Sequence, residues 1–218
     1  MTSLVLLFVG AVLLINGLVF LGVIDAKSST AINVLVGLFL AGTVLFLVLP
    51  VRGADSESLS IILGAAGFLL FSFTYLGVAF NNLAGAHSAA LGWYCGWAAL
   101  ISLFLSAVNF FQLADHRLGW IWASWSLLFV SFFLSLALEF EWMTKPAGVL
   151  AIMQAFSTCT IPAALQLTGA WTSIPVPAVA AIQIIVTAIL VWLVFSSRQT
   201  RVGRRPDPDR AASASLAH

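Results

Sequence analysis

The stretch LVLLFVGAVLLINGLVFLGVI, residues Leu4–Ile24, decides the fold class of this chain. A continuously apolar run of about 20 residues is long enough to cross the hydrocarbon core of a bilayer as a helix. The residues before it, MTS, lack the basic segment that opens a signal peptide, so we interpret the run as a retained helix.

Further apolar runs of this kind follow along the chain: Ala31–Val51, Leu59–Phe80, Ala90–Leu113, Leu118–Leu138, Pro146–Leu167 and Pro177–Phe195. None of the seven runs contains Asp, Glu, Lys, Arg or His. The whole chain is 61% hydrophobic and 8% charged, whereas a soluble domain is about 25% charged. Because the runs do not alternate apolar and polar residues, helices are preferred over a β-barrel. The sequence therefore predicts an all-α integral membrane protein, a multi-span helical bundle.

The connectors between the runs are too short to hold a soluble domain. We expect a core of six membrane helices in residues 1–168, an additional membrane helix in 169–195 and a basic, disordered cytoplasmic tail in 196–218. The sixth run is the most polar, which requires it to face protein or a water-filled path rather than lipid. Its polar residues and proline are Gln154, Ser157, Thr158, Thr160, Pro162 and Gln166.

The distribution of Lys and Arg in the connectors predicts the orientation in the membrane. With the N-terminus outside, only Arg52 and Arg117 of the nine basic residues are external. The internal ones are then Lys27, Lys145, Arg198, Arg201, Arg204, Arg205 and Arg210. This asymmetry favours a cytoplasmic C-terminal tail, provided that the seventh run spans the membrane.

The motifs of several functional classes are missing from the sequence. It has no phosphate-binding loop, no H-E-x-x-H pair and no nucleophile elbow. The spans carry no carboxylate for proton coupling and no lysine for a retinal Schiff base. Cys95 and Cys159 lack metal-ligand spacing. We therefore expect no enzyme activity, no cofactor and no metal, and the net charge of +1 favours no nucleic acid partner.

One face of the fifth run is aromatic. Trp122, Trp125 and Phe129 are spaced i, i+3 and i+7, so they share a helix face. Trp125 lies roughly 10 Å into the run at 1.5 Å per residue, and an indole N–H at that depth needs a hydrogen-bond partner. Helix packing and a pore-lining aromatic slot both account for this pattern.

Two other runs carry candidate pore residues. Leu6, Val9, Leu13 and Asn16 form a stripe on the first run, which fits a helix core as well as a pore. Asn16 also suits an interhelical hydrogen bond. On the third run Phe73 and Gly77 lie one turn apart, and Gly77 also suits close helix approach.

The sequence resembles the AmiS/UreI family of bacterial urea channels and amide transporters. The resemblance begins in LVLLFVGAVLLINGLVFLGVIDAKSSTAINVLVGLF and continues in GFLLFSFTYLGVAFN, GWYCGW and IWASWSLLF, so it covers most of the chain. It implies six helices arranged as three hairpins, a ring of protomers that is a hexamer in the best-known member, and a pore within each protomer.

The resemblance implies pore-lining roles for Leu6, Val9, Leu13, Phe73, Trp122, Trp125, Leu128, Phe129 and Gln154. Phe129 stands where the urea-channel branch has a tryptophan, Gly77 where it has an aromatic residue, and Gln154 where it has a glutamate. The first two changes widen the expected slot, and the third removes a titrating charge. Only His116 lies in an outer loop, so we predict no strong acid gating.

These features together predict a passive channel for urea or short aliphatic amides in the bacterial cytoplasmic membrane. Expected partners are the small neutral solute, the lipid bilayer, further copies of the chain and a cytoplasmic amidase or urease. The alternatives are a proton-coupled amide transporter, an ammonia- or gas-type channel, and a non-conducting structural membrane protein. The absence of histidine from the spans disfavours the ammonia channel.

Overall fold

A computed structural model describes residues 2–53 and 55–202, and within them the secondary structure is entirely helical. The longer helices are α1 (Thr2–Phe20), α2 (Thr30–Val48), α3 (Ser56–Ala84), α4 (Ala89–Phe111), α5 (His116–Leu136), α6 (Glu141–Gln154), α7 (Ile161–Leu167) and α8 (Val176–Val202). Short 3₁₀ turns occupy Lys27–Ser29 and Trp171–Ser173, and a π-helical segment, η2, occupies Ala155–Thr160.

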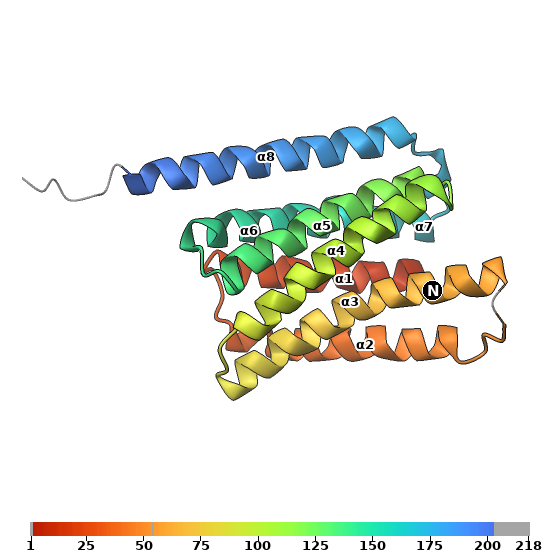
Figure 1. Cartoon of the computed structure of the whole chain (residues 1–218), viewed down its shortest axis with the longest axis horizontal. Helices are drawn as coiled ribbons and strands as arrows, with labels where there is room; N and C mark the ends of the chain where they lie inside the picture. Colours follow the sequence, from red (N-terminus) through yellow and green to blue (C-terminus); the bar gives the residue numbers. More distant parts are fainter. Residues whose placement is uncertain (1, 54, 203–218) are drawn as a thin grey trace, which may run out of the picture.

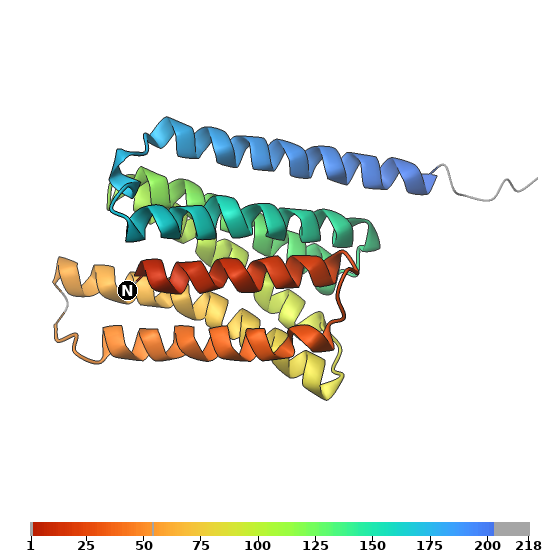
Figure 2. The ribbon, with the colours of Figure 1, turned by 180° about the vertical axis from the view of Figure 1, so that it is seen from behind.

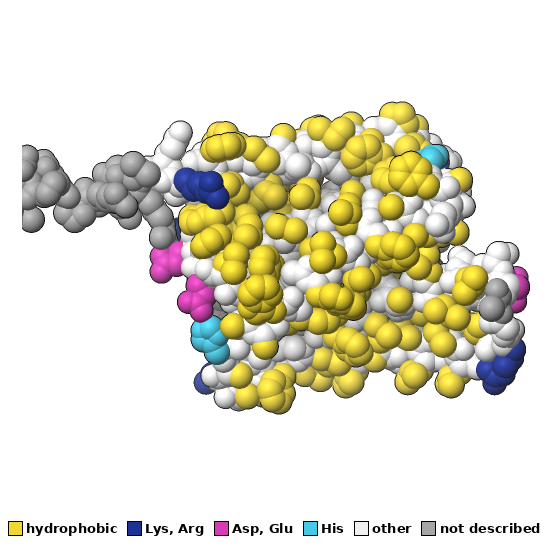
Figure 3. Space-filling view, in the orientation of Figure 1, with side chains coloured by type: hydrophobic (Ala, Val, Ile, Leu, Met, Phe, Trp, Pro, Cys, Tyr) yellow, Lys and Arg dark blue, Asp and Glu magenta, His cyan; other side chains and the backbone are white. Residues whose placement is uncertain are grey.

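The described helices include seven that are long and apolar enough to cross a membrane, with α6, η2 and α7 forming one continuous span. The space-filling view agrees, because hydrophobic side chains cover the middle of the surface and charged side chains collect at its two ends (Figure 3). The predicted multi-span helical membrane fold is confirmed.

Consecutive spans run antiparallel, as hairpins require (Figure 1). The closest helix contacts join α2 to α3, α4 to α5, and α1 to the span of α6, η2 and α7. The last of these pairs brings the first and sixth spans side by side although they are far apart in sequence (Figure 2). Helix α8 lies outside this six-span core and packs on α5 and α6.

Glycine allows α1 to approach α6 closely. A Cβ atom added at Gly17 would lie 2.6 Å from the Ile152 side chain and 2.9 Å from the Gly148 carbonyl oxygen. Such separations are shorter than van der Waals contact, so only a residue without a side chain fits there. Small residues serve this purpose between membrane helices, where backbone packing drives association.

The sixth span is interrupted by η2 immediately before Pro162. Proline has no N–H to donate to the carbonyl four residues back, and its ring would collide with that carbonyl. The wider π turn avoids the collision: the Ile161 N–H bonds to the Phe156 carbonyl, and the Thr160 hydroxyl donates to the Ala155 carbonyl at 2.8 Å. Segments of this kind inside α-helices are frequent at functional sites.

Aspartates begin two of the spans. The Asp55 carboxylate accepts the backbone N–H of Ser58 at 2.9 Å, and Asp115 does the same for Leu118 at 3.0 Å. These are N-caps, which satisfy otherwise unpaired N–H groups of the first turn. The backbone and hydroxyl hydrogen bonds from Ser58 lower the pKa of Asp55, so its carboxylate remains ionised and capping at neutral pH.

The predicted boundary of the C-terminal tail is wrong at its start. Helix α8 continues beyond Phe195 to Val202, so residues 196–202 are helical rather than disordered. Helical hydrogen bonds continue past the apolar segment, and the Arg198 guanidinium lies 4.0 Å from the centre of the Trp142 ring on α6, a cation–π contact. The rest of the predicted tail, 203–218, lies outside the described residues.

Candidate functional site

A layer of aromatic rings fills the middle of the six-span core. Phe71 of α3 is at its centre, 4.8 Å from Trp125 and 5.3 Å from Phe129 between ring centroids. Trp122 packs edge-on against Trp125 at 4.7 Å, and Tyr75 lies 6.1 Å from Phe71. All of these side chains are buried, and we call these five residues the aromatic layer. Edge-to-face and tilted contacts at such distances are the favoured geometries of aromatic pairs.

The indole N–H of Trp125 has the hydrogen-bond partner that its depth demands. It donates to the Thr158 hydroxyl at 2.9 Å, and that hydroxyl donates in turn to the Gln154 carbonyl at 2.6 Å. Thr158 belongs to η2, so the π turn presents the acceptor that holds the indole. The ring of Trp125 is therefore fixed between α3 and the sixth span.

A cavity lies on each side of the aromatic layer, at opposite ends of the bundle. The first, of about 470 Å³, lies beside the start of α1 and includes Leu6, Trp122 and Trp125 in its lining. We call it the N-side cavity and the corresponding end of the bundle the N-side end. The second, of about 160 Å³, lies beside the end of α1, and Leu13 and Asn16 contribute to it. We call this one the far-side cavity.

The predicted residues Val9, Leu128 and Phe129 are buried in the hydrophobic core that contains the aromatic layer. Five other predicted residues line one cavity or the other. They are Leu6, Leu13, Asn16, Trp122 and Trp125.

Gln154 is fully buried but lines neither cavity. Its amide nitrogen donates to the Ser124 carbonyl at 2.8 Å and to the Ser124 hydroxyl at 2.9 Å. Its amide oxygen has no partner among the described residues. Gln154 thus ties the sixth span to α5 beside Trp125.

Several buried polar atoms at this site have no protein hydrogen bond within the described part of the chain. The Tyr75 hydroxyl and the Asn81 amide nitrogen are among them, and both residues line the far-side cavity. Unsatisfied polar groups are rare in protein interiors, where they lose the hydrogen bonds of water without replacement. Their position in the lining of one cavity indicates where a polar molecule can be hydrogen-bonded.

Phe73 and Gly77, which the sequence also predicted to line the pore, lie outside the aromatic layer and line neither cavity. The Phe73 side chain is 53% exposed on the outside of the bundle. A Cβ atom at Gly77 would lie 2.9 Å from the Leu91 side chain, so Gly77 serves the approach of α3 to α4. The two residues do share a helix face, but that face points away from the aromatic layer.

Phe71 and Tyr75 take the place of this pair, and sequence reasoning missed them. They stand two residues before Phe73 and Gly77, which is about 200° around a helix and therefore on the opposite face. Their spacing of four residues in FSFTY was a visible signal of a shared aromatic face. The same spacing links Phe73 to Gly77, so the signal alone did not choose between the two faces.

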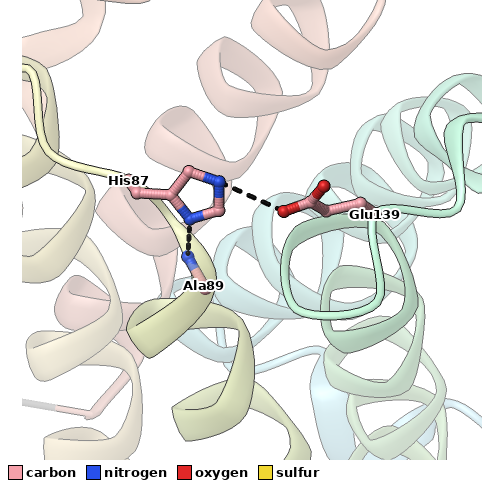
Figure 4. A network of polar contacts seen from close by, with 3 residues as sticks. All are labelled: His87, Ala89 and Glu139. Atoms are coloured by element: carbon pink, nitrogen blue, oxygen red, sulfur yellow. Dashed lines mark hydrogen bonds and ion pairs between the residues drawn. The ribbon is translucent and has the colours of Figure 1, made fainter.

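A polar contact lies beside the far-side cavity, at the end of the bundle that we call the far-side end. His87 Nε2 lies 3.1 Å from the Glu139 carboxylate, and His87 Nδ1 accepts the backbone N–H of Ala89 at 3.2 Å (Figure 4). This contact joins the α3–α4 loop to the α5–α6 loop. Ser88 and Leu136 line both the far-side cavity and the surface depression that holds the pair, so the contact lies at the cavity mouth.

The sequence and the fold of this chain are similar to those of known membrane proteins. The sequence profile of AmiS/UreI family transporters matches residues 1–170. The chain belongs to the AmiS/UreI family. As an AmiS/UreI protein it is 39% identical over 175 residues to the "Putative transporter protein AmiS2" of Rhodococcus erythropolis, covering 80% of this chain and 83% of that protein.

Two further AmiS/UreI relatives extend the comparison. The "Putative amidate substrates transporter protein" of Mycolicibacterium smegmatis is 35% identical over 209 residues, which cover 96% of both proteins. The cryo-EM structure of the Helicobacter pylori urea channel in its closed state superimposes with a TM-score of 0.70 at 30% identity, covering 78% of this chain and 100% of that one. These findings confirm the resemblance stated from the sequence.

Proposed function

We propose that this AmiS/UreI protein is a passive channel for urea and short aliphatic amides, with a pathway inside each protomer. The observation that carries the proposal is the pair of cavities at opposite ends of one protomer, separated by a single aromatic layer. This arrangement gives a small solute two access routes and one short barrier. The names of the relatives, a urea channel and amide transporters, supply the solute class.

The chemistry of the aromatic layer suits a small, planar, neutral solute. Moving an amide from water into an apolar phase costs about 2–7 kcal/mol when its hydrogen bonds are not replaced. The flat rings of Phe71 and Trp125 can contact both faces of a planar amide. The unpaired Tyr75 hydroxyl and the unpaired amide nitrogen of Asn81, both in residues that line the far-side cavity, can replace part of the lost hydration.

The same lining disfavours ions. Asp115, at the N-side rim, is the one charged residue in the described lining of either cavity, and it caps α5. The aromatic layer itself contains no charge that could replace an ion's hydration shell. Neutral solutes therefore cross at a lower cost than ions of the same size.

The aromatic rings close the interior between the cavities, so conduction requires the rings to move aside. Since no energy source enters this mechanism, we expect flux down the concentration gradient and no catalytic activity. Accumulation of an amide against its gradient would instead favour the proton-coupled alternative.

We propose that the N-side end faces outward and the far-side end faces the bacterial cytoplasm, as the positions of Lys and Arg predict. Assembly as a hexamer and docking of a cytoplasmic amidase or urease are part of the same proposal. The relative from Helicobacter pylori is named an acid-activated channel; for this chain we propose a channel without strong acid gating.

Flux through purified protein in liposomes tests the proposal. Stopped-flow light scattering with urea, formamide, acetamide and butyramide should show selective permeability relative to empty liposomes. Trp125→Ala should change the ratio of acetamide to butyramide permeability by about tenfold, which is about 1.4 kcal/mol in barrier height. Trp97→Ala is a matched control, because Trp97 is 53% exposed on the outside of the bundle. If Trp125→Ala leaves flux and selectivity unchanged, the aromatic layer is not the barrier.

A further inference from the structure

Helix α8 carries one strongly polar side chain in the middle of an apolar segment. Gln183 is 3% exposed, and neither its amide oxygen nor its amide nitrogen has a hydrogen-bond partner among the described residues. An unpaired amide inside a membrane protein is costly, because no water is present to satisfy it. The side chain thus needs a hydrogen-bonding occupant beside it.

The space for such an occupant is a cavity of about 370 Å³ between α5 and α8, which we call the α5–α8 cavity. Gln183 and Ser124 provide its buried polar groups, and Trp120 provides an aromatic wall. The hydroxyl of Thr187 also borders the cavity, but it is engaged with the Gln183 backbone carbonyl at 2.8 Å. The Gln183 amide is therefore the group of this cavity that has no partner among the described residues, while the Ser124 hydroxyl already accepts from Gln154 at 2.9 Å and can offer its O–H.

We propose that the α5–α8 cavity is a second binding site, separate from the pathway, for one small primary carboxamide. A carboxamide group presents N–H donors and a carbonyl acceptor side by side. The Gln183 amide presents the same pair, so the two groups can form reciprocal hydrogen bonds while the ligand's flat face rests against Trp120. A lipid acyl chain could fill the volume but would leave the glutamine amide unpaired. The ligand class rests on the proposed function, since an amide channel brings this solute to the membrane.

The α5–α8 cavity and the aromatic layer are both lined by residues of α5. The Ser124 hydroxyl at its edge accepts a hydrogen bond from Gln154, whose backbone carbonyl accepts one from Thr158, the partner of Trp125. A ligand that engages Ser124 is thus connected to Trp125 through a short hydrogen-bonded series. Binding of an amide at the proposed site can therefore affect the position of Trp125 in the pathway.

The site depends on α8, which lies outside the family-matched segment 1–170. The structural match to the Helicobacter pylori urea channel includes 100% of that chain but 78% of this one. The additional helix brings Gln183 against α5, so the core helices alone do not contain this unpaired amide. We infer that α8 adds a ligand site and is more than an extra membrane anchor.

Fluorine NMR on the full chain in nanodiscs tests this inference. The chain has 8 tryptophans, so 5-fluorotryptophan labelling gives a small set of signals, and Trp120→Phe identifies the one from Trp120. Titration with acetamide should shift the Trp120 signal to saturation. In Gln183→Leu the concentration for half of the shift should rise about tenfold or more, since two hydrogen bonds are lost. Gln199→Leu, the same change at an exposed position of the same helix, should behave as the wild type.

A second titration requires no variant. N,N-dimethylacetamide keeps the carbonyl but has no N–H donor, so it should shift the Trp120 signal much less than acetamide does in the wild-type protein. A Trp120 signal that does not respond to acetamide, or responds equally to both solutes or equally in Gln183→Leu, overturns the inference. Liposome flux is measured separately: flux with a silent Trp120 rejects this site alone, and absence of flux rejects the proposed channel.

Discussion

The Tyr75 hydroxyl is buried beside the aromatic layer and has no partner within the described residues. Removing it therefore breaks no hydrogen bond to another described residue. The Tyr94 hydroxyl, by contrast, donates to the Leu70 carbonyl at 3.0 Å. The two tyrosines allow the role of a pathway hydroxyl to be separated from the role of a structural one.

Tyr75→Phe should lower amide permeability several-fold and leave thermal stability unchanged or raised, because burying an unpaired hydroxyl is unfavourable. Tyr94→Phe should show the opposite pattern, with flux retained and stability reduced by about 1 kcal/mol. Liposome flux and thermal unfolding in detergent measure the two effects. Loss of stability without loss of flux in Tyr75→Phe would show that this hydroxyl does not contact the solute.

Phe71 and Phe73 give a matched test of which face of α3 lines the pathway. Phe71 is 4% exposed in the aromatic layer and Phe73 is 53% exposed outside the bundle. Phe71→Leu should change the selectivity among amides, whereas Phe73→Leu should leave both flux and selectivity within about twofold of the wild type, as surface substitutions have small effects. The reverse result would restore the assignment predicted from the sequence.

Helices α1 and α2 are joined by a reciprocal pair of amides. Asn16 donates to Asn33 at 2.9 Å, and Asn33 donates back to Asn16 at 2.8 Å while also bonding to the Ser29 carbonyl at 2.9 Å. Both side chains are buried. Interhelical hydrogen bonds of this kind hold membrane helices in register, and the contact confirms the interhelical role suggested for Asn16 by its sequence position.

Asn16→Leu should lower the free energy of unfolding by about 1–3 kcal/mol, because it leaves part of the Asn33 amide buried without a partner. The double variant Asn16→Leu, Asn33→Leu should recover much of this loss, since two apolar side chains need no partner. Chemical unfolding in detergent measures all three variants. Additive losses in the double variant would mean that the two amides are not coupled.

At the scale of the whole molecule, the histidines in the described part of the chain lie at the two ends of the bundle and outside the aromatic layer. His116 begins α5 and stacks on Phe110 at 5.9 Å, and His87 contacts Glu139 at the far-side end. The barrier between the cavities therefore contains no group that titrates near neutral pH. Gating by mild acid would need a coupling from these ends to the aromatic layer.

Urea and acetamide flux should change by less than about twofold between about pH 5 and 8, the range in which histidine usually titrates. Liposome flux with the external pH varied at constant internal pH gives the measurement. His116→Gln is the matched variant and should give the same flat profile. A steep rise in flux at acid pH that disappears in His116→Gln would show that the N-side histidine gates the channel.

The all-helical membrane fold was determined by the sequence alone, because the apolarity of each run is a local property and the bilayer sets the length that it must reach. The aromatic face of α5 was also readable, since Trp122, Trp125 and Phe129 lie on one face whatever surrounds them. The depth of Trp125 correctly required a hydrogen-bond partner, which is Thr158.

Only the tertiary structure decided which face of α3 points inward. It also decided that the Gln154 amide donates to Ser124 and that Gln183 lines a cavity between α5 and α8. Lipid is as apolar as the core of the bundle, so a membrane helix can be apolar on all sides and its pattern does not mark the inner face. The choice between Phe71 and Phe73 therefore depends on the neighbouring helices. The same holds for buried amides, whose partners come from other spans and are absent from the local sequence.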